Sequence, residues 1–181
     1  MILTKTTIFI LNSLMNAACY KIAQSIVASL TDRGWSVATA ESCTGGGIAA
    51  ALTAAPGSSA CVWGGIVAYA EAMKVRLLGV SPETLHAVGV VSEQTVVEMA
   101  RGVMRVMNSD FAVATSGIAG PSGGTEELPV GTIWVAAISH SCVITHCIRD
   151  YDKGRCQNTQ NAVLEALKML QKVVEGEEKQ P

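Results

Sequence analysis

The stretch "WSVATAESCTGGGIAAAL", residues 35–52, decides the fold class of this chain. Small and β-forming residues over 35–40 predict a strand, and the alanine-rich run from Gly46 to Ala54 predicts a helix. Three glycines at the junction allow a tight turn from the strand into the helix. A serine, a thiol and a threonine lie at the mouth of this turn, which fits a nucleophile site, an anion site or simply a capped helix.

Helices and strands alternate along the rest of the chain. Apolar spacing and stop signals predict further helices over 16–33, 70–79, 81–89, 92–108 and 155–174. Strands are predicted over 60–69, 110–117, 130–139 and 142–151, the last two as an antiparallel hairpin. This order favours an α/β fold, a three-layer α/β/α sandwich with a mixed, mostly parallel sheet.

One domain is expected over residues 16–175, because no internal repeat or linker interrupts them. The N-terminus faintly resembles a signal peptide, but asparagines interrupt its apolar run. We therefore expect an irregular leader over 1–15, with Met15 as a second candidate start. The residues 176–181 are polar and are expected to form a frayed tail.

The composition favours a well-packed cytoplasmic protein. Of the 181 residues, 49% are hydrophobic and 15% are charged, which provides for a core and argues against disorder. A net charge of −2, with only three Trp, three Tyr and two Phe, argues against a nucleic-acid partner. No apolar run reaches the ~18 residues expected of a membrane span, so no membrane partner is predicted.

The six cysteines lack the paired spacing of a zinc site or a disulfide framework. They are Cys19, Cys43, Cys61, Cys142, Cys147 and Cys156. We expect free, buried thiols in a reducing compartment, and no metal site.

Two glycine-rich loops each follow a predicted strand, one at 44–47 and one at 115–124. In open α/β sheets, ligands bind outside the carboxyl ends of the strands, so the two loops can share one crevice. The first loop matches neither GxxxxGKS/T nor GxGxxG, so it meets neither standard nucleotide fingerprint. A glycine-rich surface turn is the simpler interpretation of the second loop.

Ser42 can act as a nucleophile only if a neighbouring group accepts its proton. A histidine base is poorly supported, because none of the three histidines lies in a recognisable catalytic motif and GxSxG is absent. The histidines are His86, His140 and His146. In "YAEAMK", Tyr69 ends a predicted strand and Lys74 lies just inside the next helix. A lysine partly buried beside a serine can lose its charge near neutral pH, and a tyrosine can position the proton. The alternative is a solvated lysine next to a half-buried tyrosine.

Cys43 competes with Ser42, because a thiol near a helix N-terminus has a lowered pKa. Neighbouring side chains in a tight turn usually point apart, so we expect only one of the two to face the crevice. Thr44 would donate a hydrogen bond to a bound carbonyl or phosphate, or cap the helix.

Several motifs in order resemble those of one known family. They are "AESCTGG", "PGSSA", "GGIVAYAEAMKVRLLGV", "VSEQTVVEMA", "SGIAGPSGGTEELPVGTIWVA" and a "GR" before the last helix. Over about residues 18–172 the chain resembles the CinA C-terminal domain family, which includes amidases that hydrolyse nicotinamide mononucleotide to the acid and ammonia. The resemblance implies a three-layer α/β/α sandwich, usually a homo-oligomer, a small pyridine nucleotide as ligand, and no metal or organic cofactor.

The resemblance also implies roles for individual residues. Ser42 corresponds to the proposed nucleophile, Lys74 to its general base and Tyr69 to the partner of that base. Arg155 resembles a phosphate-facing arginine. The remaining expected binding residues are Thr44, Gly45, Gly46, Ser58, Ser59, Ser116, Gly117, Ile118, Ala119 and Gly120.

The chain departs from the family pattern near the site. Ala70 and Glu71 stand where a serine or threonine and an asparagine are usual, and residues 153–155 read Lys-Gly-Arg instead of Gly-Asp-Arg. Thr159 and Gln160 occupy the region that commonly carries a further arginine. Two alternatives therefore stay open: a non-catalytic nucleotide-binding relative, and an amidase for another small amide.

Overall fold

A five-stranded sheet with strand order β2-β1-β3-β4-β5 forms the centre of the molecule. The computed structural model describes residues 5–149 and 152–177. The strands are β1 (Val37–Glu41), β2 (Val62–Val67), β3 (Phe111–Gly117), β4 (Thr132–Ile138) and β5 (Val143–Arg149). β1 pairs in parallel with β2 and β3, whereas β4 is antiparallel to β3 and β5. The predicted α/β class and mixed sheet are confirmed.

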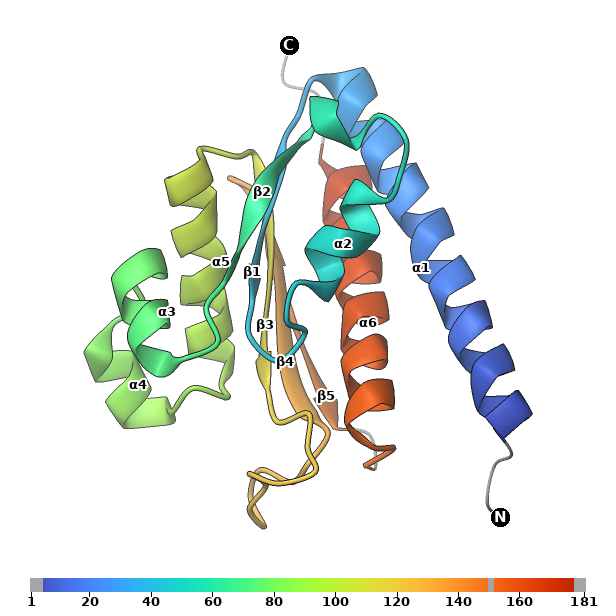
Figure 1. Ribbon diagram of the computed structural model, residues 1–181. Coiled ribbons are helices and arrows are strands. Elements are labelled where there is room, and N and C mark those ends of the chain that lie inside the picture. Colours follow the sequence, from blue (N-terminus) through green and yellow to red (C-terminus); the bar gives the residue numbers. More distant parts are fainter. Residues whose placement is uncertain (1–4, 150–151, 178–181) are drawn as a thin grey trace.

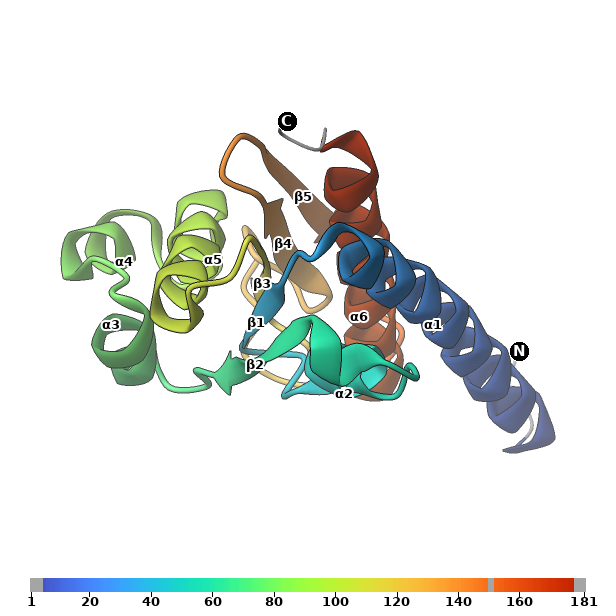
Figure 2. The ribbon, with the colours of Figure 1, turned by 90° about the horizontal axis from the view of Figure 1, so that it is seen from above.

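Helices cover both faces of the sheet, which makes three layers (Figure 1). They are α1 (Lys5–Arg33), α2 (Gly47–Thr53), α3 (Glu71–Leu78), α4 (Pro82–Val88), α5 (Glu93–Met107) and α6 (Arg155–Gly176), and a 3-10 turn, η1 (Ser58–Ala60), precedes β2. On one face α5 packs against β3 and β4, and α3 and α4 pack against α5. On the other face lie α2 and α6, and α1 packs against α6, as the view from above shows (Figure 2).

The first helix begins earlier than the sequence analysis predicts. It starts at Lys5 and not near residue 16, so the expected irregular leader is wrong for residues 5–15. The reason is that this stretch contains neither glycine nor proline, and isolated asparagines weaken a helix without ending it. Residues 1–4 of the leader and 178–181 of the expected tail lie outside the described residues. Within the described ranges, no helix is long and apolar enough to cross a membrane.

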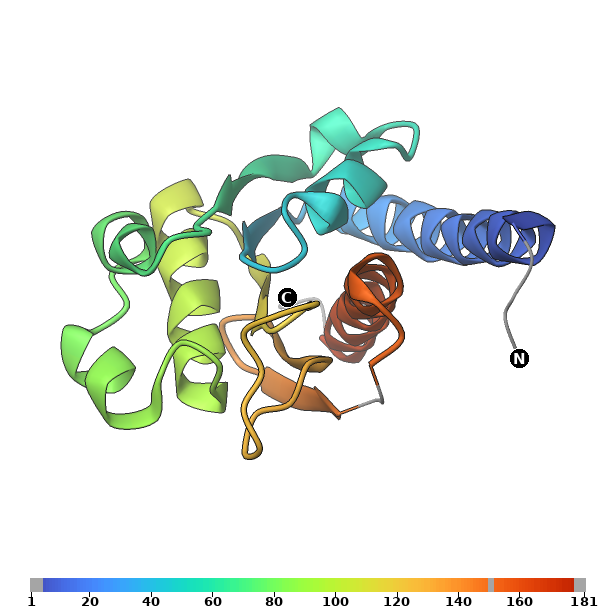
Figure 3. The same cartoon turned by 60° about the horizontal axis from the view of Figure 1, so that its bottom comes forward.

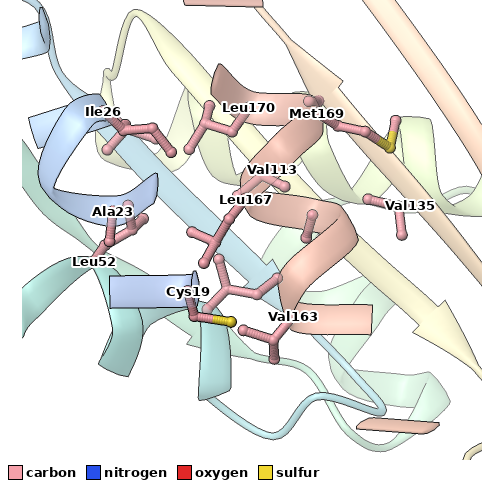
Figure 4. Close-up of a cluster of buried hydrophobic side chains, with 14 of the residues drawn as sticks. Cys19, Ala23, Ile26, Leu52, Val113, Val135, Val163, Leu167, Met169 and Leu170 are labelled. Atoms are coloured by element: carbon pink, nitrogen blue, oxygen red, sulfur yellow. The ribbon is translucent and has the colours of Figure 1, made fainter. Parts of the chain in front are cut away.

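Apolar side chains fill both spaces between the sheet and its helices. The close-up in Figure 4 shows one of these clusters, in which Leu52 of α2 and Leu167 of α6 pack with residues of α1 and the sheet. Ile48 and Leu52 of α2 are both fully buried, and each such side chain stabilises the fold by about 1.5–3 kcal/mol. This packing fixes α2, and with it the turn that joins α2 to β1.

The three parallel strands end at the same edge of the sheet. Figure 3 brings this edge forward and shows the turn after β1, the loop after β3 and the start of α6 around it. The strand order therefore brings together segments that are far apart in the sequence, as expected for a ligand site in an open α/β sheet.

Candidate active site

A buried lysine and a serine lie in hydrogen-bond contact at this edge. Lys74 of α3 is 2% exposed, and its Nζ lies 2.9 Å from Oγ of Ser42, the residue directly after β1. The same Nζ donates to the backbone oxygen of Ala68 at 2.8 Å and to that of Tyr69 at 3.4 Å. The contact joins two residues 32 positions apart, and it is the geometry that a serine nucleophile and its base require.

Burial lowers the pKa of Lys74 below its ordinary value, because the protein interior disfavours the ammonium form. Opposite charges nearby, the Cys43 thiolate if it forms and the carboxylate of Glu71, act against this effect and are smaller. The neutral amine carries a lone pair that can accept the Ser42 proton, so the lowered pKa favours Lys74 as a base.

Cys43 is not activated at this site. Burial raises the pKa of its thiol to about 12, and the charges of Lys74 and Arg155 lower it only in part. Both Cys43 and Ser42 contribute to the lining of the cavity, and Cys43 is buried. The chemistry still separates them, because a thiol with so high a pKa supplies almost no thiolate at neutral pH.

The side chain of Glu41 stabilises the turn between β1 and α2. Its side chain is fully buried, and its carboxylate accepts the backbone N–H groups of Gly46, Ile48 and Ala49 at 2.9, 3.1 and 2.8 Å. These groups belong to the start of α2, where backbone N–H donors have no partner within the helix. Sequence analysis missed this role. The one feature of the sequence that indicates this role is a carboxylate at the end of a predicted strand, just before a glycine-rich helix start.

The glycine-rich sequence after Ser42 predicts the backbone N–H groups of residues 44–46 as donors to an oxyanion at this serine. The N–H of Gly46 is bound to Glu41 at 2.9 Å, and that of Gly45 to the backbone oxygen of Ser42 at 3.1 Å. Within the part of the chain that the structure describes, the N–H groups of Cys43 and Thr44 form no hydrogen bond to the backbone of another residue. Two of the three predicted donors, those of Gly45 and Gly46, are therefore already used, and Cys43, which lines the cavity, offers a donor that was not predicted.

The serine and the lysine open into a cavity of about 270 Å³. The opposite wall comes from the end of β3 and the loop after it, as expected for Ser116, Gly117, Ile118 and Ala119. Ser116 Oγ donates to the backbone oxygen of Val90 at 2.6 Å, which ties this wall to the segment before α5. A Cβ at Gly117 would lie 2.6 Å from Ile133 of β4, so only glycine lets the two strands approach this closely here.

Arg155 closes one side of the cavity. Its Nη1 donates to the backbone oxygen of Gly120 at 2.7 Å, and its Nη2 donates to the Tyr69 hydroxyl at 2.7 Å. Tyr69 is 60% exposed and contacts Lys74 through its backbone oxygen only, so its hydroxyl is the partner of Arg155 and not of the lysine. Gly120 itself does not line the cavity.

Six of the expected binding residues do not line the cavity, namely Thr44, Gly45, Gly46, Ser58, Ser59 and Gly120. Ser58 and Ser59 belong to η1, at the amino end of β2 and so at the opposite edge of the sheet. Ser58 Oγ donates to the backbone oxygen of Thr53 at 3.2 Å. Thr44 is buried, and its hydroxyl is hydrogen-bonded to that of Thr115 at 2.7 Å, which fastens the turn to β3.

A second buried residue was missed. Asn158 of α6 donates to the backbone oxygen of Ala119 at 3.0 Å and to Asp152 at 2.9 Å, so it holds the cavity wall against the start of α6. The sequence alone does not indicate this role, because Asn158 lies within a predicted helix.

A larger cavity of about 540 Å³ lies between α1, α2 and α6, where Thr159 and Gln160 contribute to an otherwise mostly apolar lining. Among the described residues that line it, no pair resembles the serine and lysine of the first cavity.

The cysteines and the possible metal ligands are the candidates for a second site in residues 5–149 and 152–177. All six cysteines are free, and three of them are buried. In the part of the chain that the structure describes, no group of three or more His, Cys, Asp or Glu residues is placed to hold a metal ion.

Fold and site together define an α/β protein with a serine–lysine pair at the carboxyl edge of its parallel strands. The family model of the CinA C-terminal domain matches residues 19–174. A CinA-like protein of Shewanella amazonensis is 45% identical over 86% of this chain and 37% of its own length. The chain belongs to the CinA C-terminal domain family.

Two further relatives bear on structure and function. The crystal structure of the competence/damage inducible protein CihA from Agrobacterium tumefaciens has a TM-score of 0.85 at 43% identity, and the match covers 86% of this chain and 95% of that one. A protein of Shewanella oneidensis named nicotinamide-nucleotide amidohydrolase PncC is 48% identical over 71% of this chain and 30% of its own length. The chain thus spans about a third of the length of the curated relatives it matches.

Proposed function

We propose that the chain is an amidohydrolase that converts nicotinamide mononucleotide to nicotinic acid mononucleotide and ammonia, with Ser42 as nucleophile and Lys74 as general base. The observation that carries the proposal is the buried Lys74 amine, 2.9 Å from Ser42 Oγ in a cavity. The relative named nicotinamide-nucleotide amidohydrolase supports the choice of substrate.

The first half of the reaction forms an acyl-enzyme. Lys74, in its neutral form, takes the Ser42 hydroxyl proton while Oγ forms a bond to the carboxamide carbon. The backbone N–H of Cys43, which lines the cavity next to Ser42, is the candidate to stabilise the oxyanion. The carbon–nitrogen bond then breaks, and Lys74 returns the proton to the leaving nitrogen, which departs as ammonia.

The second half releases the acid. Lys74 takes a proton from a water molecule as the water oxygen attacks the ester carbon, and Ser42 leaves with the proton that Lys74 gives back. Arg155 donates one hydrogen bond to Gly120 and one to Tyr69, which leaves further guanidinium N–H groups for a ligand. We propose that these bind the phosphate of the nucleotide. Tyr69 then orients Arg155 and does not relay the proton.

The test is ammonia release from nicotinamide mononucleotide by the purified chain and by Ser42→Ala and Lys74→Met variants. We expect turnover by the unchanged chain and a loss of at least about a thousandfold in each variant, as for nucleophile and base removal elsewhere. Full activity in Ser42→Ala would remove the assigned nucleophile. Turnover confined to another small amide, or binding without turnover, would favour one of the two alternative functions.

A further inference from the structure

A carboxylate that the proposed mechanism does not use lines the reaction cavity. Glu71 lies in the first turn of α3, three residues before Lys74, and lines the same cavity as Ser42 and Tyr69. An acidic residue in the first turn stabilises a helix through its dipole, which is the simplest role for this side chain. That role alone does not require the carboxylate to border a cavity.

The protein does not neutralise this carboxylate by direct contact. Lys74 Nζ lies within hydrogen-bond distance of Ser42 Oγ and of the backbone oxygens of Ala68 and Tyr69, and not of Glu71. Arg155 donates to Gly120 and Tyr69 instead. Among the residues that the structure describes, no ion pair to Glu71 is formed. A negative charge therefore borders the cavity with room for a cation from a ligand.

The proposed substrate carries a cation in the required place. Its carboxamide carbon must reach Ser42 Oγ, and that carbon is bonded directly to a pyridinium ring with a permanent positive charge. The phosphate lies at the far end of the molecule. The two charges of the substrate thus match two charged residues of the cavity lining, Glu71 for the pyridinium ring and Arg155 for the phosphate.

We propose that Glu71 is a specificity-determining residue, which selects carboxamides attached to a cationic, N-substituted pyridinium ring over amides on an uncharged ring. This inference rests on the proposed function, because it takes the carboxamide to lie at Ser42. It also bears on product release. The product carries a carboxylate where the substrate has a neutral amide, so Glu71 repels the product more than the substrate.

The experiment compares two ligands that differ in ring charge. Dissociation constants are measured by calorimetry for nicotinamide mononucleotide and for its reduced dihydropyridine form, whose ring is uncharged. The protein is the full chain with Ser42→Ala, so that neither ligand is hydrolysed, with and without Glu71→Gln. Glu83→Gln is the matched control, because Glu83 occupies the first turn of the neighbouring α4 but does not line the cavity.

We expect Glu71→Gln to reduce the preference for the charged ring by about twofold to fivefold, the range for one exposed charge pair. Glu83→Gln should leave the ratio of the two constants unchanged. An unchanged ratio in Glu71→Gln, or no binding of the charged form by the chain that retains Glu71, overturns the inference. If the unchanged chain releases no ammonia while the ratio still depends on Glu71, the proposed function fails and the charge preference stands.

Discussion

The most informative residue is a lysine that the fold keeps away from water. Lys74 is held by three acceptors, and two of these are backbone oxygens whose positions are set by the end of β2. The sequence predicted Ser42 and Lys74 as a pair, and the structure places them in contact. It could not predict that the Tyr69 hydroxyl turns to Arg155, because that contact joins residues 86 positions apart.

The rate of hydrolysis should depend on pH through Lys74. Its pKa lies below the ordinary 10.5 because burial disfavours the ammonium. The base must be neutral, so kcat/KM should rise with pH and level off above that lowered pKa. A pH–rate profile measures this, and Lys74→Arg, which stays charged, should be inactive throughout. A rate that is flat across pH would contradict Lys74 as the base.

The same shift affects the free energy of unfolding. Between the lowered pKa of the folded state and the ordinary pKa of the unfolded chain, the unfolded state binds more protons at Lys74. Stability should therefore rise with pH in that window, and Lys74→Met should remove this part of the slope. Urea unfolding at several pH values measures it. An identical slope in the variant would argue against a depressed pKa.

Removal of the neighbouring thiol should matter little for catalysis. Because burial raises the pKa of Cys43 to about 12, its thiol is almost wholly protonated at neutral pH. We expect Cys43→Ala to retain activity within about threefold, while Ser42→Ala loses about a thousandfold or more. A comparable loss in both variants would make the thiol part of the chemistry.

Among the elements, the start of α2 depends on one buried carboxylate. Glu41→Gln replaces an acceptor of three backbone N–H groups by an amide that turns an NH2 toward them. We expect a loss of about 3 kcal/mol in the free energy of unfolding, the cost of unpaired buried donors near a lost charge. Urea denaturation measures it, with Glu83→Gln, an exposed residue at the start of α4, as the control. Equal stability of the Glu41 variant and the unchanged chain would argue against this role.

The position of α3 depends on a glycine of α5. A Cβ at Gly102 would lie 2.0 Å from the backbone oxygen of Leu78, at the end of the helix that carries Lys74. Gly102→Ala should therefore shift α3, cost about 1–3 kcal/mol of stability and lower kcat. Gly176→Ala, where a Cβ meets nothing within 4 Å, is the control. Unchanged activity in a destabilised Gly102→Ala chain would show that Lys74 does not depend on this contact.

Elements with strong local patterns were predictable from the sequence. Helix α5 follows the prediction closely, because Ser92 accepts the N–H of Thr95 at its start and one face is apolar. The start of α1 was not predictable from its apolar spacing, since no stop signal separates residues 5–15 from the rest of the helix. The role of Glu41 was missed because its partners become neighbours only once the turn has formed.

At the scale of the whole molecule, strand order assembles the site. Parallel pairing of β1 with β2 and β3 brings Ser42, Tyr69 and Ser116 to one edge, although they are spread over 75 positions of the sequence. The chain corresponds to about a third of its curated relatives, so the activity of a whole relative is proposed for it and not transferred. Assembly into a homo-oligomer stays a prediction from the resemblance.

The most direct test of the central claim is mass spectrometry of the chain quenched within milliseconds of mixing with nicotinamide mononucleotide. The account predicts a transient acyl adduct on the peptide that contains Ser42, absent in Ser42→Ala, together with release of ammonia. The account would be contradicted if the unchanged chain released ammonia without forming the adduct and the Ser42→Ala chain were equally active.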